Sequence, residues 1–328
     1  MTLLPLSPRE PPLRLGPFRT EAGVTLPDLR VAYRRDGPPG PSAVLVVHAL
    51  TGSADAAGDW WEPLIGPGKT LDTDRHQVIC LNLLGSCYGT TGPREVVDFP
   101  PITPRDMARA QWAALDALNV ERLELVTGGS LGGMVSLEVG MERPMAVDAV
   151  MPIAAPAVVG NLAAGWNHIQ LQMLELDPDR GLELARQLAM TTYRSEADFD
   201  TRSGIGSYLE HQGRKLRQRF HAGSYAALAG AMNAHDIGRG RGGVVEALRV
   251  FGEAGVALTG VGIDGDILYG PRQVHALVNA ALAAKVDASY RQIASDKGHD
   301  AFLVEWDQVT DHLRGCLPAR RREVAASA

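Results

Sequence analysis

The residues best suited to chemistry lie in one glycine-rich segment. Gly128, Ser130 and Gly132 fit the pattern G-x-S-x-G, which forms a tight turn between a strand and a helix and exposes a strained nucleophilic serine. An apolar run at 123–126 precedes the pattern, and a helix is expected at 134–142. Glycines are needed in such a turn because the backbones pass too closely for a Cβ. The alternative is a glycine-rich turn that contains a serine by chance, but such a turn would not need a strand before it and a helix after it. We therefore interpret Ser130 as a nucleophile.

A serine nucleophile requires a histidine base and an acid that orients the imidazole. His275 and His312 lie in expected helices, whereas His299 lies on a loop between the last expected strand and the last expected helix. Such a loop reaches the carboxyl edge of a parallel sheet, so His299 is the predicted base. The acid should follow the preceding strand, where Asp264 and Asp266 both stand. Spacing alone does not separate these two aspartates.

The same chemistry requires two backbone N–H donors for the oxyanion of a tetrahedral intermediate. One is expected from Leu131, which directly follows the nucleophile, and the other from a loop after an early strand. An apolar strand at 43–47 leads into the sequence His48-Ala49-Leu50-Thr51-Gly52, and we predict Leu50 as the second donor. His48 is expected to be a structural residue that is hydrogen-bonded within this loop.

These residues must be positioned by an alternation of strands and helices. A helix begins at residues 103–106, with a cap, a proline and an acid in its first turn. A final helix is expected to carry Phe302, Trp306, Val309 and Leu313 on one face. The alternation predicts an α/β fold, with a mostly parallel sheet and helices on both faces. Strands are expected at 13–20, 29–34, 43–47, 77–81, 123–126, 147–153, 256–261 and 288–293.

The pattern changes between residues 160 and 253, where helices are expected without a convincing strand. A helical segment inserted into an alternating chain indicates a lid over the catalytic edge of the sheet. We therefore predict a first core segment at 1–160, a helical lid at 161–254 and a second core segment at 255–328. The basic run at 320–322 is expected to be solvated.

The composition restricts the class of protein. The 328-residue chain contains 45% hydrophobic and 21% charged residues, with a net charge of −6 and a pI near 5.9. These values are typical of a globular protein and argue against a nucleic-acid or anionic-membrane surface. Cys80, Cys87 and Cys316 form no paired framework, which indicates a reducing cytoplasm. No metal signature such as H-E-x-x-H occurs, residues 1–12 lack the apolar core of a signal peptide, and the apolar stretch at 149–160 is too short to span a membrane.

Dispersed motifs in this chain resemble those of the homoserine O-acetyltransferase family. They are residues 48–52, 66–69, 72–75, 84–93, 128–134, 192–196, 207–213 and 298–303, and the match runs from about Leu15 to Glu305. The resemblance implies an α/β-hydrolase fold with a helical lid, usually in a homodimer. It also implies acetyl transfer from acetyl-CoA, a co-substrate and not a bound cofactor, to the hydroxyl of L-homoserine in methionine biosynthesis.

The resemblance also implies roles for individual residues. It selects Asp266 as the triad acid, because its setting before Ile267-Leu268-Tyr269 matches the family's aspartate. Arg186 is expected to bind the carboxylate of the amino-acid substrate, and Asp300 is expected to bind its ammonium. Tyr193 is a further candidate for substrate binding beside them.

The chain departs from the family pattern at several positions. Leu131 stands where methionine is usual, which leaves the backbone donor intact, and Gly270 replaces a usual proline. The segments 177–180 and 201–205 stand where many members have longer lid loops. The leading hypothesis is a ping-pong acyltransferase with an acyl-enzyme on Ser130. A succinyl donor, an L-serine acceptor and a carboxylester hydrolase with the same triad are the alternatives.

Overall fold

The computed structural model describes residues 10–317, so the first nine residues and the basic run at 320–322 lie outside the described part. At its centre is a seven-stranded sheet, which contains β5 (Tyr33–Asp36), β6 (Ser42–Val47), β9 (Val78–Leu81), β10 (Arg122–Gly129), β11 (Ala149–Ile153), β12 (Ala257–Ile263) and β13 (Ala288–Ile293). The strand order is β13-β12-β11-β10-β6-β9-β5, and every neighbouring pair is parallel except β5 with β9. This arrangement confirms the predicted mostly parallel sheet. The sequence pattern did not predict the antiparallel edge strand β5.

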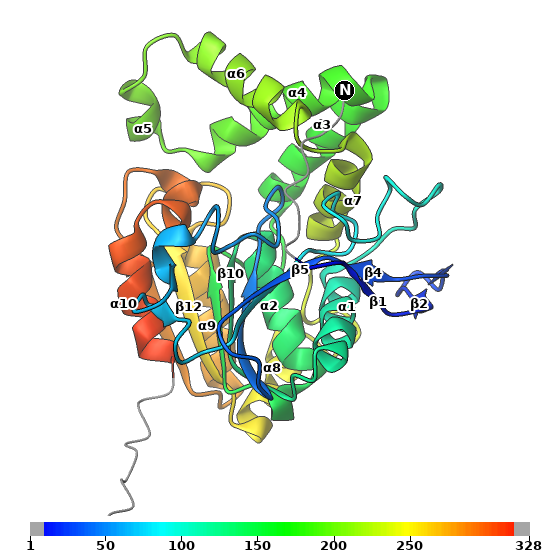
Figure 1. Ribbon diagram of the computed structural model, residues 1–328. Helices are drawn as coiled ribbons and strands as arrows, with labels where there is room; N and C mark the ends of the chain where they lie inside the picture. The colour runs from blue at the N-terminus through cyan, green and yellow to red at the C-terminus, as the bar shows by residue number, and fades with distance from the viewer. Residues whose placement is uncertain (1–9, 318–328) are drawn as a thin grey trace, which may run out of the picture.

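Helices cover both faces of this sheet. They are α1 (Pro104–Ala117), α2 (Leu131–Glu142), α8 (Val244–Ala254), α9 (Pro271–Ala283) and α10 (Trp306–Cys316). The first four cover one face, and α10 covers the other together with Trp61 (Figure 1). Successive side chains of β6 point to opposite faces, so Leu45 packs with the first group and Val46 with the second. Both faces are therefore buried, as the continuous apolar strands predicted.

Helix α1 begins as the sequence predicted. The Thr103 hydroxyl oxygen accepts the N–H of Asp106 at 3.2 Å, and the Asp106 carboxylate accepts the N–H of Thr103 at 3.1 Å. Pro104 occupies the first turn, where a missing N–H is tolerated. This capping box satisfies two amides that the helix itself cannot pair. It fixes the start of α1, which packs along α2.

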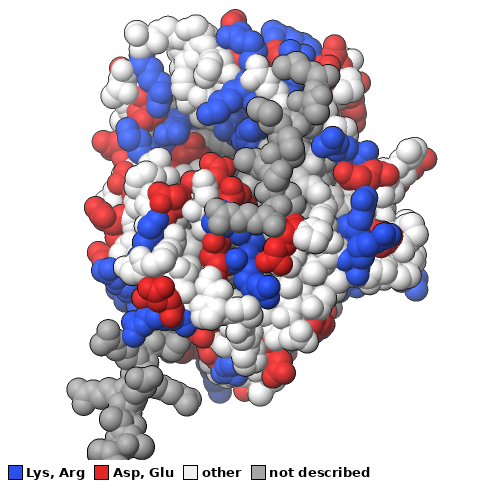
Figure 2. All heavy atoms as spheres, viewed as in Figure 1, with Lys and Arg blue, Asp and Glu red and all other residues white. Residues whose placement is uncertain are grey.

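Five helices lie above the carboxyl ends of the strands. They are α3 (Asn161–Leu176), α4 (Pro178–Tyr193), α5 (Glu196–Asp200), α6 (Ile205–Arg217) and α7 (Ala222–Asn233) (Figure 1). On the face shown in Figure 2, acidic and basic side chains are interspersed over these helices and the core. Helix α8 falls within the range 161–254 predicted for the lid, but it packs against α2 and α9 beside the sheet. The division of the chain at residues 160 and 254 stays a prediction.

The helical insertion leaves the core and returns to it at one place. The N–H of Val159 donates to the carbonyl of His235 at 3.0 Å, and the N–H of Ile237 donates to the carbonyl of Ala157 at 3.1 Å. His235 also contacts the carbonyl of Pro156 through Nε2 at 2.8 Å. Burial lowers the pKa of His235 to about 4 despite this hydrogen bond. The two ends of the insertion therefore form a paired stem, residues 156–159 with 235–237.

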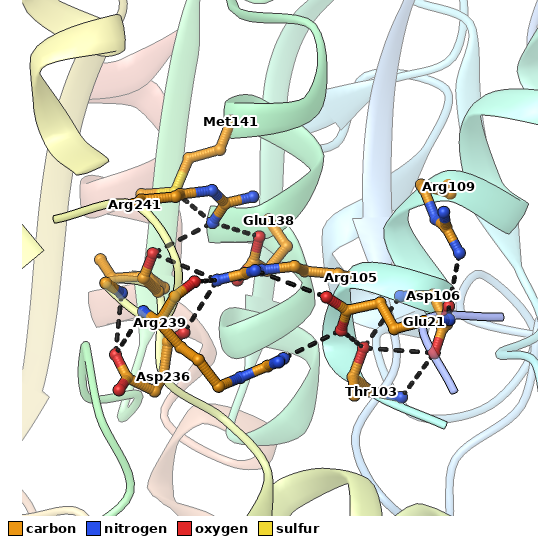
Figure 3. Close-up of polar contacts among 12 residues, drawn as sticks. Glu21, Thr103, Arg105, Asp106, Arg109, Glu138, Met141, Asp236, Arg239 and Arg241 are labelled. Atoms are coloured by element: carbon orange, nitrogen blue, oxygen red, sulfur yellow. Dashed lines mark hydrogen bonds and ion pairs between the residues drawn. The ribbon is translucent and has the colours of Figure 1, made fainter. Parts of the chain in front are cut away.

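A buried ion cluster holds the returning chain against α2 (Figure 3). Glu138 of α2 is only 2% exposed and accepts from Arg105 of α1 at 3.2 Å and from Arg241 at 2.7 Å. Arg105 also donates to the backbone carbonyl of Arg239 at 2.6 Å. Burial raises the pKa of Glu138 more than the two guanidinium groups lower it. The cluster joins α1, α2 and the segment that follows the insertion.

The remaining elements are short. Antiparallel pairs form between β1 (Leu13–Arg14) and β4 (Arg30–Val31) and between β2 (Phe18–Arg19) and β3 (Thr25–Leu26), so the strands expected at 13–20 and 29–34 are present as shorter pieces. Strands β7 (Ile65–Gly66) and β8 (Leu71–Asp72) pair in parallel. The described residues also include three 3-10 helices, η1 (Glu62–Leu64), η2 (Pro144–Ala146) and η3 (Gly298–Leu303).

The predicted final helix was partly wrong. Val309 and Leu313 are buried on α10, but Phe302 belongs to the separate helix η3. Trp306 begins α10 and is 41% exposed, so it does not contribute to a single buried face. The break arises at Val304 and Glu305, whose backbones leave the helical region and separate η3 from α10.

Candidate active site

Ser130 lies at the turn between β10 and α2. Its φ is 58° and its ψ is −124°, a sparsely populated conformation for a residue with a side chain. The turn is held by the Ser130 N–H, which donates to the carbonyl of Ile153 at 2.9 Å. A Cβ on Gly128 or Gly132 would lie 2.3 or 2.2 Å from the carbonyl oxygen of Val47. Because β6 passes this close, both glycines are required by the packing that holds the serine in this turn.

His299 and Asp266 form a buried hydrogen-bonded pair. Nδ1 of His299 lies 2.7 Å from Oδ2 of Asp266, and Oδ1 of Asp266 accepts the N–H groups of Leu268 and Tyr269 at 2.8 and 3.0 Å. An anionic carboxylate accepts, so the proton belongs on Nδ1 and Nε2 keeps its lone pair. Asp264 instead contacts the side-chain amide of Gln292. The structure thus separates the two aspartates that spacing left open.

The electrostatics of His299 suit a base. Burial lowers the pKa of its imidazole. The pKa is raised by the charge of Asp266, by the hydrogen bond to Asp266 and by the charge of Asp300, and the net shift is upward from 6.5. Nε2 is buried and has no hydrogen-bond partner among residues 10–317. A buried polar atom without a partner is uncommon in proteins. At His299 it leaves a lone pair that could accept a proton from a hydroxyl group.

Most of the predicted site residues line one cavity of about 90 Å³. The cavity is bordered by Ala49, Leu50, Thr51, Ser130, Arg186, Tyr193, His299, Asp300, Phe302 and Leu303. Asp266 stands behind His299, and Leu131 directly follows Ser130 as the first residue of α2. The structure therefore brings together segments from the core, the insertion and the loop after β13. All eight residues predicted from the sequence lie in or next to this cavity.

The Leu50 amide is oriented by His48. The Nε2 atom of His48 accepts the N–H of Leu83 at 3.0 Å, so Nδ1 carries the proton and donates to the carbonyl of Ala49 at 2.8 Å. That carbonyl and the Leu50 N–H belong to one planar trans peptide and point in opposite directions. Burial lowers the pKa of His48 to about 4, which keeps it neutral. The expectation that His48 is a structural residue in this loop is confirmed.

The second predicted donor is Leu131. Its N–H lies at the first position of α2, where the helix does not pair its own amides and the helix dipole is positive. Within residues 10–317, neither this N–H nor that of Leu50 has a backbone acceptor. Two unpaired donors beside a candidate nucleophile could stabilise an oxyanion.

Two arginines contact the other residues predicted to bind the acceptor. The Arg186 guanidinium lies over the Tyr193 ring, 5.5 Å from its centroid. Asp300 forms an ion pair with Arg194 at 3.1 Å, which the sequence reasoning missed. The sequence feature that could have identified Arg194 is its position directly after Tyr193 in the motif 192–196. Its ion-pair partner, however, depends on how the insertion packs against the core. Gly298 permits that packing, since a Cβ there would lie 2.7 Å from the backbone nitrogen of Ser195.

Sequence reasoning also missed Arg219, which follows α6. It donates from Nη1 to the carbonyl of Thr51 and to the hydroxyl of Tyr88, both at 2.8 Å. Thr51 borders the cavity. The contact therefore connects the insertion to the loop that carries Leu50.

Among residues 10–317, no group of three or more metal-ligating side chains could hold an ion. None of the helices in this part of the chain is long and apolar enough to cross a membrane.

Known proteins resemble this chain in sequence and in fold. The model of the alpha/beta hydrolase fold family matches residues 42–199. A homoserine O-acetyltransferase from Thermus thermophilus is 42% identical over 94% of this chain and 90% of its own. The crystal structure of a homoserine O-acetyltransferase from Staphylococcus aureus has a TM-score of 0.84 and 30% identity over 95% of this chain and 96% of that one. Esterase E22 shares the fold, with a TM-score of 0.85 at 18% identity over 94% of this chain and 99% of its own.

Proposed function

The chain belongs to the homoserine O-acetyltransferase family, and on that premise we propose that it moves an acetyl group from acetyl-CoA to the hydroxyl of L-homoserine by a ping-pong mechanism. Its α/β-hydrolase fold, predicted from the resemblance, is confirmed. The observation that carries the proposal is the unpaired, buried Nε2 of His299, which borders the same cavity as Ser130 and is oriented by Asp266. The proposed product would be the first committed intermediate on the route to methionine.

In the first half-reaction, Ser130 Oγ attacks the carbonyl carbon of the thioester while His299 Nε2 takes the hydroxyl proton. The carbonyl oxygen becomes an oxyanion, which the N–H groups of Leu50 and Leu131 stabilise. The carbon–sulfur bond then breaks, and the coenzyme sulfur leaves with the proton held by His299. An acetyl ester remains on Ser130.

In the second half-reaction, homoserine replaces the free coenzyme. Its hydroxyl oxygen attacks the acetyl carbonyl while His299 takes the hydroxyl proton, and an oxyanion forms again in the same place. The bond to Ser130 Oγ breaks, and His299 returns its proton to the serine. The helical insertion above the cavity supports transfer over hydrolysis, because excluding water protects an acyl-enzyme.

The charges around the cavity support recognition of an amino acid. Arg186 forms no ion pair with a carboxylate among residues 10–317, so its planar fork is available for the carboxylate of homoserine. Asp300 offers a negative charge for the ammonium, and Tyr193 borders the space between them. The cavity of about 90 Å³, bordered by apolar Phe302 and Leu303, supports a small acyl group over succinyl.

A homodimer is part of the same proposal. Leu162, Ile169 and Leu176 on α3 are 64%, 44% and 88% exposed and recur every seven residues, which places them on one side of the helix. Exposed apolar side chains in such a row are typical of a helix that packs against a partner. Light scattering of the purified chain would measure its mass in solution. The cytoplasmic location inferred from the cysteine pattern also remains part of the proposal.

A stopped assay tests the reaction. Purified protein is given acetyl-CoA or succinyl-CoA, each with homoserine, serine or water as the acceptor. We expect O-acetylhomoserine as the main product and, when the acceptor is omitted, an acetyl group on Ser130 in peptide mass spectra. Free acetate as the main product at saturating homoserine would support the carboxylester hydrolase instead. An acetylated Ser130→Ala protein would refute the covalent route.

A further inference from the structure

We propose that Arg219 is a positioning residue for the oxyanion hole, which holds the Leu50 loop in place from the helical insertion. The proposal deepens the function proposed above, because it rests on an acyl-enzyme at Ser130. It assigns to the insertion a role in the chemical step itself, in addition to covering the cavity.

Arg219 is fixed at both ends of its side chain. Its guanidinium bridges the Thr51 carbonyl and the Tyr88 hydroxyl at 2.8 Å each. The next residue, Phe220, is 2% exposed and packs edge-on against the Tyr88 ring, with 5.6 Å between the ring centroids. Burial raises the pKa of the Tyr88 phenol, although the Arg219 charge lowers it, so the hydroxyl remains protonated and accepts through its oxygen. The backbone that carries Arg219 is therefore anchored where its guanidinium binds.

The bonding pattern of Arg219 differs from that of its neighbours on α6. Arg214 pairs with Glu210 at 3.2 Å, and Arg217 pairs with Glu183 at 2.7 Å, so both bind carboxylates within the insertion. Arg219 binds two uncharged oxygens of the core. A guanidinium donating to a neutral carbonyl is a charge-assisted hydrogen bond, which is stronger than a neutral one. Its partner here is the carbonyl of Thr51, the residue that follows Leu50 in the same loop.

The Leu50 amide lies between two held carbonyls. His48 holds the Ala49 carbonyl from within the core, and Arg219 holds the Thr51 carbonyl from the insertion. Together these two bonds restrict the backbone torsions of Leu50 and Thr51, which lie between the two held peptides. Without Arg219, the peptide after Thr51 keeps only the turn hydrogen bond from the Gly52 N–H to the Ala49 carbonyl at 3.0 Å, so the direction of the Leu50 N–H is held less firmly. An oxyanion donor acts through its preorganised direction, so a small loss of alignment slows the reaction.

The test compares Arg219→Met, which keeps the apolar stem but has no donor, with Arg219→Lys, which keeps a charged donor. Arg214→Met is the matched control, since Arg214 makes a half-exposed pair on α6, the helix that directly precedes Arg219. Acylation of Ser130 by p-nitrophenyl acetate is followed in stopped flow, where the burst amplitude counts active sites and the burst rate reports the chemical step. Transfer from acetyl-CoA to homoserine is measured in parallel.

For Arg219→Met we expect a burst rate per active site about tenfold lower, because a misaligned donor is less damaging than the 10²–10³-fold loss of a removed one. Arg219→Lys should retain more of the rate. The kcat for homoserine transfer should fall by a similar factor with little change in KM, since both half-reactions form an oxyanion in the same hole. The control should match the wild type.

The inference would be overturned if the burst rate of Arg219→Met equalled that of the wild type. Losses confined to the burst amplitude, the thermal stability or the KM for homoserine would show that Arg219 is only a structural contact. The ester requires neither coenzyme A nor homoserine. A wild-type protein that shows an ester burst without homoserine transfer would therefore refute the proposed function, while the comparison of Arg219 variants would still decide this inference.

Discussion

Replacing Asp300 with asparagine should weaken acceptor binding while leaving acylation by the donor nearly intact. The Asp300 side chain is 14% exposed, borders the cavity and pairs through Oδ2 with Arg194 at 3.1 Å. Its other oxygen, Oδ1, takes no part in that pair and is available for the ammonium that we propose it binds. Asparagine keeps the shape of the side chain and an oxygen that can accept from Arg194, but it removes the charge.

The size of the effect follows from these contacts. A hydrogen bond to a charged group contributes about 1.5–3 kcal/mol. Arg194 already neutralises part of the Asp300 charge, so the ammonium competes for it and the lower end of this range applies. Since about 1.4 kcal/mol corresponds to a factor of ten in binding, we expect the KM for homoserine to rise about tenfold.

The assay is acceptor kinetics at saturating acetyl-CoA with homoserine and with 4-hydroxybutyrate, which lacks the amine. The wild type should prefer homoserine, and Asp300→Asn should lose most of that preference. The acetylation burst without acceptor should change little. Asp296→Asn is the control, because it removes the same charge from an exposed residue of the same loop. A wild-type preference retained by Asp300→Asn, or an equal loss in the control, would show that Asp300 does not bind the ammonium.

Three further outcomes are expected. Asp266→Asn should lower kcat by about 10⁴-fold, because an amide no longer selects the reactive His299 tautomer. Circular dichroism would verify that the variant folds, and near-normal turnover would refute the role of Asp266 in orienting His299. Gly132→Ala should lower the free energy of unfolding by about 3 kcal/mol or more, since its Cβ would lie 2.2 Å from the Val47 carbonyl; a wild-type urea midpoint would contradict this. Only neutral His299 accepts a proton, and its pKa is raised from 6.5. We therefore expect kcat/KM to decrease as the pH is lowered through a midpoint that lies above pH 6.5. That midpoint should move to lower pH in Asp300→Asn, where a carboxylate that raises this pKa is lost, and an unmoved profile would argue against the coupling.

Features that depend on residues close together in the chain could be predicted from the sequence, whereas most contacts between distant segments could not. Ser130 and its strand–turn–helix setting follow from residues adjacent in the chain, and the parallel sheet follows from short apolar runs. Asp264 and Asp266 could not be separated by spacing, because the choice depends on which carboxylate reaches His299 after the strands pair. Arg194 and Arg219 act across the boundary between the insertion and the core, so their partners appear only when the chain is folded. The broken final helix likewise depends on how Phe302 packs beside the turn that carries Ser130, where Gly129 leaves room for its ring.

The paired stem at 156–159 and 235–237 makes the helical insertion a module that can be exchanged. Its two ends are already together, so replacing the 75 residues between Gly160 and Ala234 need not change how far apart the core strands lie. Evolution, or a protein engineer, could thus vary the acceptor pocket through Arg186 and Tyr193 while the sheet and the triad stay as they are. A transplanted module would fit the stem readily, but it would give an efficient catalyst only if it also supplied a donor for the Thr51 carbonyl.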